Sequence, residues 1–225
     1  MEGIWETKVS FDMDTWSMME NVGWFVAIVG PSGAGKDTVI NAVHEILVNN
    51  EAFLFTRRII TRKSGVSQQN ENPKNLGNED NMEVSVAKFL KLLDQGAFAM
   101  HWFAHGIYYG LPADIKNDVK QGKIVIANIS RECLGMASKL FDHVFVVEIN
   151  APVQILKERL INRKREEKSD IAERLGRANV SIHLPERAEY SYIDNSGDVK
   201  IAVGKLLAIL ENLAGQKPRS IAEKR

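Results

Sequence analysis

A glycine-rich run near the start of the chain constrains its fold more than any other feature. Residues 30–38 read Gly-Pro-Ser-Gly-Ala-Gly-Lys-Asp-Thr, between the apolar segment 24–29 and the helix-like segment 39–47. A strand, a glycine loop and a helix in this order are typical of the P-loop, in which backbone N–H groups and a lysine surround nucleotide phosphates. A chance glycine-rich turn would seldom place the lysine and both flanks in register. The residues predicted to bind a triphosphate are Gly30, Pro31, Ser32, Gly33, Ala34, Gly35, Lys36, Asp37 and Thr38.

One position of this loop departs from the usual pattern. The residue after the lysine is normally Ser or Thr, whose hydroxyl binds Mg²⁺, whereas here it is Asp37, followed by Thr38. A carboxylate is a hard oxygen ligand that suits Mg²⁺, so Asp37 and Thr38 are the candidate metal ligands. The alternative is that Asp37 caps the helix and leaves the metal to Thr38 or to water. The sequence leaves both interpretations open.

Composition limits the class of protein and its partners. With 225 residues, 44% of them hydrophobic, the chain is predicted to form one domain with a sizeable core. Its formal net charge is zero, so we expect neither nucleic acid nor an acidic membrane as a partner. The single cysteine, Cys133, excludes an internal disulfide. Residues 1–23 lack the pattern of a signal peptide, and no apolar stretch approaches the roughly 18 residues of a membrane span, so we expect a cytoplasmic protein.

Strand-like and helix-like segments alternate along the chain. This alternation predicts a three-layer α/β fold built on a parallel sheet, with ligands beyond the carboxyl ends of the strands. A segment rich in Asn, Gln and Gly, residues 63–82, is predicted to be a surface loop. The predicted strands are 24–29, 53–60, 97–103, 123–128 and 143–149. The predicted helices are 39–48, 84–95, 112–121, 133–140, 152–165 and 199–213.

Arginines are densest in the stretch that follows the fifth predicted strand. Arg159 and Arg163 are four residues apart, and Arg174 and Arg177 are three apart, so each pair shares a helix face. Guanidinium groups suit the oxygens of a phosphoryl group in transfer. We therefore predict a helical lid that carries these arginines over the phosphates. The alternative is a solvated loop whose arginines pair with neighbouring glutamates.

A second group of residues is predicted to meet the acceptor of the reaction. Arg58 and Arg62 are four residues apart in an extended segment, so their side chains point to the same side. Tyr108 and Tyr109 stand close to two glycines and offer hydroxyl groups. These side chains are candidates for binding a phosphate of the acceptor.

The sequence also lacks a motif that supplies a catalytic base. Separately, the run from Asn128 to Arg131 ends an apolar strand, where site residues are expected, but it lacks the customary acidic residue that closes a second phosphate motif, which argues against a standard Mg²⁺ scheme. A hydroxyl acceptor would normally need a positioned Asp or His. An acceptor phosphate is already ionised near neutral pH and needs none. The pattern therefore favours a phosphate as the acceptor group.

These motifs together resemble the guanylate kinase branch of the nucleoside monophosphate kinases. Within that branch the chain is more similar to the ribose 1,5-bisphosphate phosphokinases of the phosphonate pathway, over about residues 24–213. The motifs shared with the branch are the run 30–36, Thr61-Arg62, Tyr108-Tyr109-Gly110 and Arg159-Leu-x-x-Arg163 with Arg174. Those shared with the phosphokinases are Lys36-Asp37-Thr38, Arg58-Ile-Ile-Thr61-Arg62, the run 102–110, Asn128-x-Ser130-Arg131, Asn162-Arg163-x-Arg165-Glu166 and Asp194-Asn195-Ser196-Gly197.

Two differences separate the chain from true guanylate kinases. Those enzymes follow Thr-Thr-Arg with Arg-Pro-Gly-Glu, whereas Lys-Ser-Gly follows Arg62 here. They also carry an acidic strand end leading to Gln-Gly, where this chain has Asn128-Ile-Ser-Arg131. The part that reads guanine is therefore expected to differ, while the phosphate-binding part remains. The stretch 68–78 also looks like an insertion where the family has a shorter acceptor-binding lobe.

The resemblance implies a role for each matching residue. Residues 30–38 would hold the phosphates of ATP with Mg²⁺, and Lys36, Arg163 and Arg174 would be catalytic. Asp194 and Asn195 would lie where these kinases contact adenine. The residues implied to position the acceptor are Arg58, Thr61, Arg62, Tyr108, Tyr109 and Arg131.

The resemblance also implies a P-loop kinase with a small acceptor-binding lobe and an arginine lid. An N-terminal extension, 1–23, would precede a kinase domain, 24–213, and a tail, 214–225; the lobe would span about 56–110 and the lid about 159–177. The implied reaction is ATP-dependent phosphorylation of ribose 1,5-bisphosphate to 5-phospho-α-D-ribose 1-diphosphate in phosphonate catabolism. The alternatives are a guanylate or other nucleoside monophosphate kinase and a non-catalytic binding module of guanylate kinase shape. The chain could act as a monomer or a homodimer.

Overall fold

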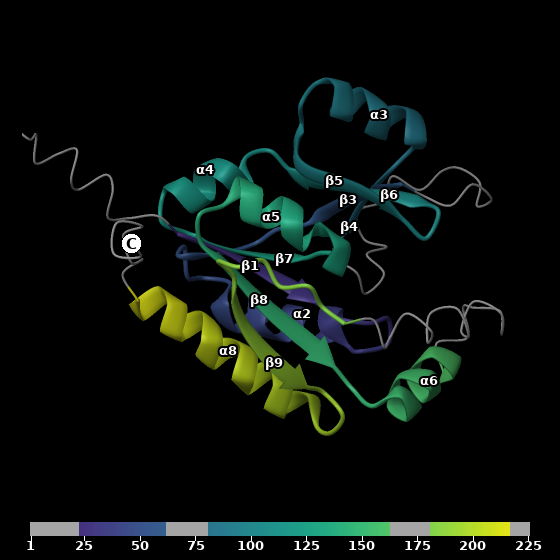
Figure 1. Cartoon of the computed structure of the whole chain (residues 1–225), viewed down its shortest axis with the longest axis vertical. Coiled ribbons are helices and arrows are strands. Elements are labelled where there is room, and N and C mark those ends of the chain that lie inside the picture. The colour runs from purple at the N-terminus through teal and green to yellow at the C-terminus, as the bar shows by residue number, and fades with distance from the viewer. Residues whose placement is uncertain (1–22, 62–80, 163–180, 217–225) are drawn as a thin grey trace, which may run out of the picture.

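Two sheets organise the part of the chain that the computed structural model describes, residues 23–61, 81–162 and 181–216 (Figure 1). The larger sheet has five strands in the order β2-β7-β1-β8-β9, and every neighbouring pair in it is parallel. The predicted α/β architecture around a parallel sheet is therefore confirmed. The strands of this central sheet are β1 (Trp24–Val29), β2 (Phe53–Phe55), β7 (Ile124–Asn128), β8 (Val144–Asn150) and β9 (Glu189–Asp194).

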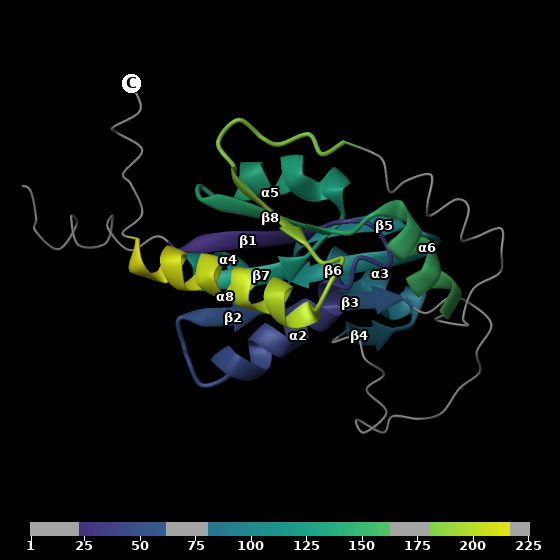
Figure 2. The ribbon, with the colours of Figure 1, turned by 90° about the horizontal axis from the view of Figure 1, so that it is seen from below.

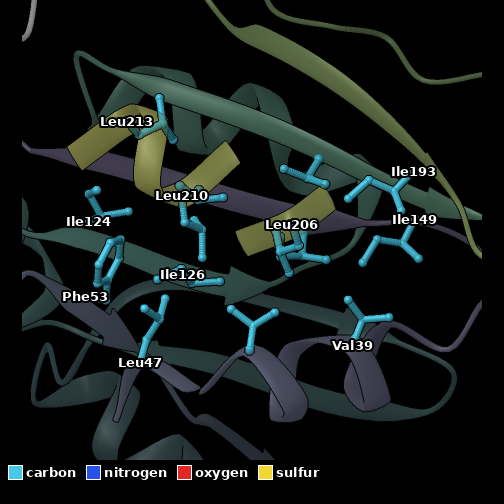
Figure 3. Packing of buried hydrophobic residues seen from close by; sticks show 14 of the residues in the cluster. Val39, Leu47, Phe53, Ile124, Ile126, Ile149, Ile193, Leu206, Leu210 and Leu213 are labelled. Atoms are coloured by element: carbon cyan, nitrogen blue, oxygen red, sulfur yellow. The ribbon is translucent and has the colours of Figure 1, made fainter. Parts of the chain in front are cut away.

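Helices cover both faces of the central sheet, which gives the predicted three layers (Figure 2). Helices α2 and α8 pack on one face, where Figure 3 shows Leu47 beside Ile126 and Val39 beside Ile149. Helices α4 and α5 pack on the other face, together with Phe25 and Phe141. The helices are α2 (Lys36–Leu47), α3 (Val86–Asp94), α4 (Ile115–Lys120), α5 (Leu134–Leu140), α6 (Val153–Asn162) and α8 (Val199–Gly215).

The central strand β1 is buried along its whole length. Its side chains alternate between the two faces: Val26 and Ile28 face α2 and α8, while Phe25 and Ala27 face α4 and α5. A strand that is covered on both faces needs apolar residues at every position, which is why its sequence is a continuous apolar run. This strand carries the glycine loop at its carboxyl end.

A second, smaller sheet of four strands lies beside the central one, in the order β4-β3-β6-β5 (Figure 1). Strands β3 and β4 are parallel, whereas β6 is antiparallel to both β3 and β5. Strands β5 and β6 form a hairpin whose turn residues, His105 and Gly106, both have positive φ, as a type I′ turn requires. Its strands are β3 (Arg58–Thr61), β4 (Asn81–Val84), β5 (Phe98–Ala104) and β6 (Ile107–Pro112).

Several predicted elements differ from the observed ones. The predicted strand 53–60 is two strands, of which β2 belongs to the central sheet and β3 to the second sheet. The predicted strand 97–103 is β5 of the second sheet rather than a central strand. Strands β4, β6 and β9 were not predicted. Strand β9 is mostly exposed, with only Ile193 fully buried, so its apolar pattern is weak.

Other expectations fall on residues outside the described ranges. These are the N-terminal extension up to residue 22, most of the 63–82 loop, the lid from residue 163 to 177 and the end of the tail. Within the ranges that are described, no helix has the length and apolar character needed to cross a bilayer.

Candidate active site

The glycine loop connects β1 directly to α2, as the P-loop prediction requires. Gly30, Gly33 and Gly35 have φ of +144°, +85° and +83°, values that other residues rarely adopt. A Cβ atom on Gly30 would overlap the carbonyl oxygen of Ile149, and one on Gly35 would overlap the side-chain amide of Asn195. Glycine is therefore required both by the backbone shape and by the close approach of neighbouring atoms. Helix α2 begins immediately after the loop, so its N-terminal N–H groups face the same space.

The side chain of Lys36 lies across this loop. Its Nζ donates hydrogen bonds to the backbone oxygens of Gly30, at 2.8 Å, and Pro31, at 3.0 Å. Two carbonyl oxygens of the loop thus hold the ammonium group against it. The side chain of Thr38, two residues further along α2, is exposed.

Asp37 joins three elements of the structure. Its Oδ1 accepts a hydrogen bond of 2.6 Å from Nδ2 of Asn128, at the end of β7, and lies 3.7 Å from Nη2 of Arg58, at the start of β3. The N-cap residue of α2 is Gly35, and no side chain caps this helix. The structure therefore does not support helix capping as the role of Asp37.

The residues around Asp37 fit one magnesium ion. The described residues contain no group of three or more His, Cys, Asp or Glu side chains that could hold a metal by themselves. Mg²⁺ in kinase sites, however, typically needs only one or two carboxylates, with the substrate phosphates and water completing its coordination. Within the described residues, only Oδ1 of Asp37 is engaged by the contacts with Asn128 and Arg58, which leaves Oδ2 as a hard oxygen beside the loop.

Arg58 is held against the second sheet from two directions. Its Nε donates a 3.0 Å hydrogen bond to Oδ1 of Asn81, on the neighbouring strand β4. Its guanidinium carbon lies 5.7 Å from the centre of the Tyr109 ring, and that ring stacks on Trp102 at 5.3 Å. Arg58, Tyr109 and Trp102 therefore form one stack on the face of the second sheet that meets Asp37.

Tyr108 points the other way, as alternation along β6 dictates. Its ring packs on Phe89 of α3, with the ring centres 5.4 Å apart. Its backbone N–H donates a 2.9 Å hydrogen bond to the hydroxyl oxygen of Thr61, whose side chain is almost fully buried. The structure thus places Tyr109 next to Arg58, and places Tyr108 and Thr61 where they hold β3, β6 and α3 together.

A small pocket opens where α2, the ends of β2 and β7, and the second sheet meet. This is the carboxyl edge of the parallel strands, where α/β proteins bind their ligands. The pocket is lined by Asp37, Ile40, Asn41, His44, Phe55, Thr56, Arg58, Asn81, Ile126 and Asn128.

Asn195 supports the glycine loop from behind. Its side chain is almost fully buried, and its Nδ2 donates a 2.8 Å hydrogen bond to the backbone oxygen of Ala34. Its own backbone oxygen accepts a 2.8 Å hydrogen bond from Nη2 of Arg159. The neighbouring Asp194 is exposed and accepts a hydrogen bond from the backbone N–H of Ser196 in a tight turn. Asn195 is therefore part of the support of the phosphate loop.

Arg131 follows β7 and has a different electrostatic partner. Burial lowers the pKa of its guanidinium, and the nearby carboxylate of Glu148 on β8 partly opposes this. Glu148 also accepts a 2.8 Å hydrogen bond from the hydroxyl of Tyr190, and burial is the main reason that the pKa of Tyr190 rises to about 12. Three other predicted site residues, Arg62, Arg163 and Arg174, lie outside the described residues.

The structure adds three residues to the candidate site. Trp102 and Asn81 fix the position of Arg58, and Arg159 binds the backbone of Asn195. The arginine-rich stretch of the sequence already indicated Arg159 as a candidate, although the prediction placed it in a lid over the phosphates. Asn81 had none, because it belongs to a strand that only long-range pairing defines.

Comparison with known proteins places the chain in a family. No family model matches it. It is 41% identical to the ribose 1,5-bisphosphate phosphokinase PhnN of Brucella melitensis over 193 residues, which cover 85% of this chain and 94% of that protein. It is 37% identical to the protein of the same name from Rhizobium etli over 196 residues, 86% of this chain and 92% of that one.

Among solved structures, the guanylate kinase of Anaplasma phagocytophilum is similar, with a TM-score of 0.60 and 20% identity over 90% of this chain and 92% of that one. At that identity the likeness concerns the fold, and it agrees with a P-loop kinase architecture. The matches extend over nearly the whole length of these curated relatives. This chain therefore belongs to the ribose 1,5-bisphosphate phosphokinase family.

Proposed function

We propose that this protein transfers the γ-phosphoryl group of ATP to the 1-phosphate of ribose 1,5-bisphosphate, which yields 5-phospho-α-D-ribose 1-diphosphate and ADP. The observation that carries the proposal is the 41% identity over 94% of a relative with that name. The glycine loop with Lys36 supports it, because this loop has the geometry of a phosphate cradle. Both proposed substrates are small molecules, and the proposed setting is cytoplasmic phosphonate catabolism.

Catalysis in this proposal consists of positioning and charge neutralisation. The N–H groups of the loop and of the first turn of α2 bind the phosphates of ATP, and Lys36 exchanges its two carbonyl partners for phosphate oxygens. Arg163 and Arg174 are assigned by resemblance to the phosphoryl group in transfer. No side chain has to remove a proton, because the attacking phosphate oxygen is already ionised.

Asp37 is the proposed protein ligand for magnesium, with Thr38 or water beside it. Bound Mg²⁺ would neutralise charge on the ATP phosphates. Asn128 holds the carboxylate of Asp37 in place through the 2.6 Å hydrogen bond. Asn195 and Arg159 keep the loop in its shape from the opposite side.

The acceptor is proposed to enter between α2 and the second sheet. Arg58 and Tyr109 meet it directly, and Arg62 and Arg131 are assigned to it by resemblance. Tyr108, which resemblance also assigns to the acceptor, lies on the opposite face of β6 and packs on Phe89. Thr61 acts indirectly, because its buried hydroxyl accepts the backbone N–H of Tyr108 and so fixes β6 against β3. Asp194 remains assigned to the nucleotide side.

The test is a coupled kinase assay that compares ribose 1,5-bisphosphate, GMP and no acceptor, with phosphorus NMR of the products. We expect turnover with ribose 1,5-bisphosphate and a new diphosphate signal. GMP is the second candidate because of the guanylate kinase fold, and a strong preference for GMP would overturn the proposal. Failure to bind Mg-ATP in calorimetry would instead indicate a non-catalytic module.

A further inference from the structure

The pocket beside the glycine loop contains one permanent cation, Arg58, among the side chains that line it. Asp37, Ile40, Asn41 and His44 line it from α2, and their spacing places them on one face of that helix. The pocket therefore extends along α2 from the phosphate loop for about two helical turns. A group in this pocket would lie beside the triphosphate of ATP rather than in its place.

The guanidinium group of Arg58 is fixed before any ligand arrives. Asn81 accepts its Nε–H at 3.0 Å, and the ring of Tyr109, backed by Trp102, lies against its face. The side chain is only 16% exposed. A rotamer that is already fixed loses little entropy on binding, so this arginine is prepared to hold an anion.

The two amino nitrogens of Arg58 are the part of the group that faces a ligand. Within the described residues neither makes a hydrogen bond, because the contact of Nη2 with Oδ1 of Asp37 is 3.7 Å long, beyond the usual range of about 2.7–3.2 Å. This contact is a partly exposed ion pair, and such pairs are weak. A phosphate that accepts two parallel hydrogen bonds from the same nitrogens makes a stronger interaction.

The proposed acceptor carries two phosphates with different roles. One reacts and must approach the γ-phosphate of ATP above Lys36. The other lies at the far end of the sugar and needs a separate cationic site. We propose that Arg58 binds this non-reacting 5-phosphate in the pocket, and thereby selects a sugar bisphosphate over a sugar with a single phosphate. This inference rests on the proposed function.

The experiment combines variants of the protein with truncated substrates. Binding of ribose 5-phosphate and ribose 1-phosphate is measured by calorimetry for the wild type and for Arg58→Gln. Turnover of ribose 1,5-bisphosphate is measured in parallel. We expect Arg58→Gln to weaken binding of ribose 5-phosphate and to reduce kcat/KM for the bisphosphate by roughly 10- to 100-fold, as for a lost charged hydrogen-bonding partner. Binding of ribose 1-phosphate should change little.

Two further variants separate this role from a general loss of charge or of structure. Arg58→Lys should recover only part of the effect, because an ammonium group cannot make the paired contact. Arg57→Gln is the matched control: this neighbouring arginine is exposed, and its replacement should leave the preference for a 5-phosphate intact. Unchanged Mg-ATP binding shows that each variant is folded around the loop.

Two outcomes would overturn the inference. In one, Arg58→Gln weakens the binding of ribose 1-phosphate and the binding of ribose 5-phosphate equally. In the other, Arg58→Gln keeps the full affinity for ribose 5-phosphate. Failure of the proposed function looks different, because the wild type itself would then not phosphorylate ribose 1,5-bisphosphate.

Discussion

The phosphate loop and the pocket beside it are built in opposite ways. The loop is one continuous segment whose backbone forms the site, and its glycines are demanded by positive φ and by close neighbours. The pocket is made of side chains from α2, β2, β3, β4 and β7, which are distant in the sequence. If the proposed function holds, substitutions in the pocket should therefore alter the choice of acceptor while the backbone of the loop stays as it is.

Among these variants, Lys36→Ala should reduce turnover the most. A small reduction would contradict the difference drawn between the loop and the pocket. The substitution removes the cation that the loop carbonyls now hold, so kcat should fall on the order of 10²–10³, the scale for loss of one transition-state donor. Steady-state kinetics with ribose 1,5-bisphosphate measure the change. Lys120→Ala, at an exposed position on α4, is the control. Near-normal turnover of Lys36→Ala would remove the loop from the mechanism.

Asn195→Ala tests whether the loop depends on its buried support. It leaves the backbone oxygen of Ala34 without its hydrogen-bond donor, which should cost about 1–3 kcal/mol of unfolding free energy in urea. ATP affinity should fall with it, while the affinity for ribose 5-phosphate should not. Equal losses at both sites would show that Asn195 supports the whole fold rather than the loop.

Asn128→Ala probes a hydrogen bond that joins the two regions. Without the amide of Asn128, the carboxylate of Asp37 is no longer held in place. We therefore expect the Mg²⁺ concentration needed for half-maximal binding to rise roughly 10-fold, as for loss of a group that orients a metal ligand. The measurement is binding of an ATP analogue at several Mg²⁺ concentrations, with Asn117→Ala as an exposed control. A loss of binding that excess Mg²⁺ does not restore would show that Asn128 acts on the loop itself rather than through the metal.

Tyr109→Leu compared with Tyr108→Leu should give the smallest effect. Tyr109 supports Arg58 through a cation–π contact worth about 0.5–1 kcal/mol, so KM for the acceptor should rise a few-fold while KM for ATP stays constant. Tyr108→Leu removes packing on Phe89 and should lower stability without changing KM. If Tyr108→Leu changed KM instead, the role that resemblance assigns to Tyr108 would hold.

Local patterns predicted the central strands β1, β7 and β8 well because they reflect local causes. The buried strand β1 is apolar at every position, and the helices after β1, β7 and β8 follow their strands closely. Pairing between strands that are far apart in the sequence leaves a weaker pattern in the residues of each strand. The run 53–60 looked like one strand, yet the chain leaves the central sheet after Phe55 and enters the second sheet at Arg58. Nothing within those residues records the change of sheet.

The direction of side chains was the second point that local patterns left open. Tyr108 and Tyr109 are equivalent as a sequence motif, but consecutive residues of a strand face opposite sides. Only the register of β6 against β3 and β5 shows that Tyr109 meets Arg58 and that Tyr108 meets α3.

The sequence by itself determined the nucleotide loop, because a phosphate cradle is a short backbone conformation that glycines at fixed spacing specify. Tertiary structure alone decided the pocket that is proposed for the acceptor. Asp37, Arg58, Asn81 and Asn128 are brought together by strand order and register, and their mutual hydrogen bonds and charge contact exist only once both sheets have formed.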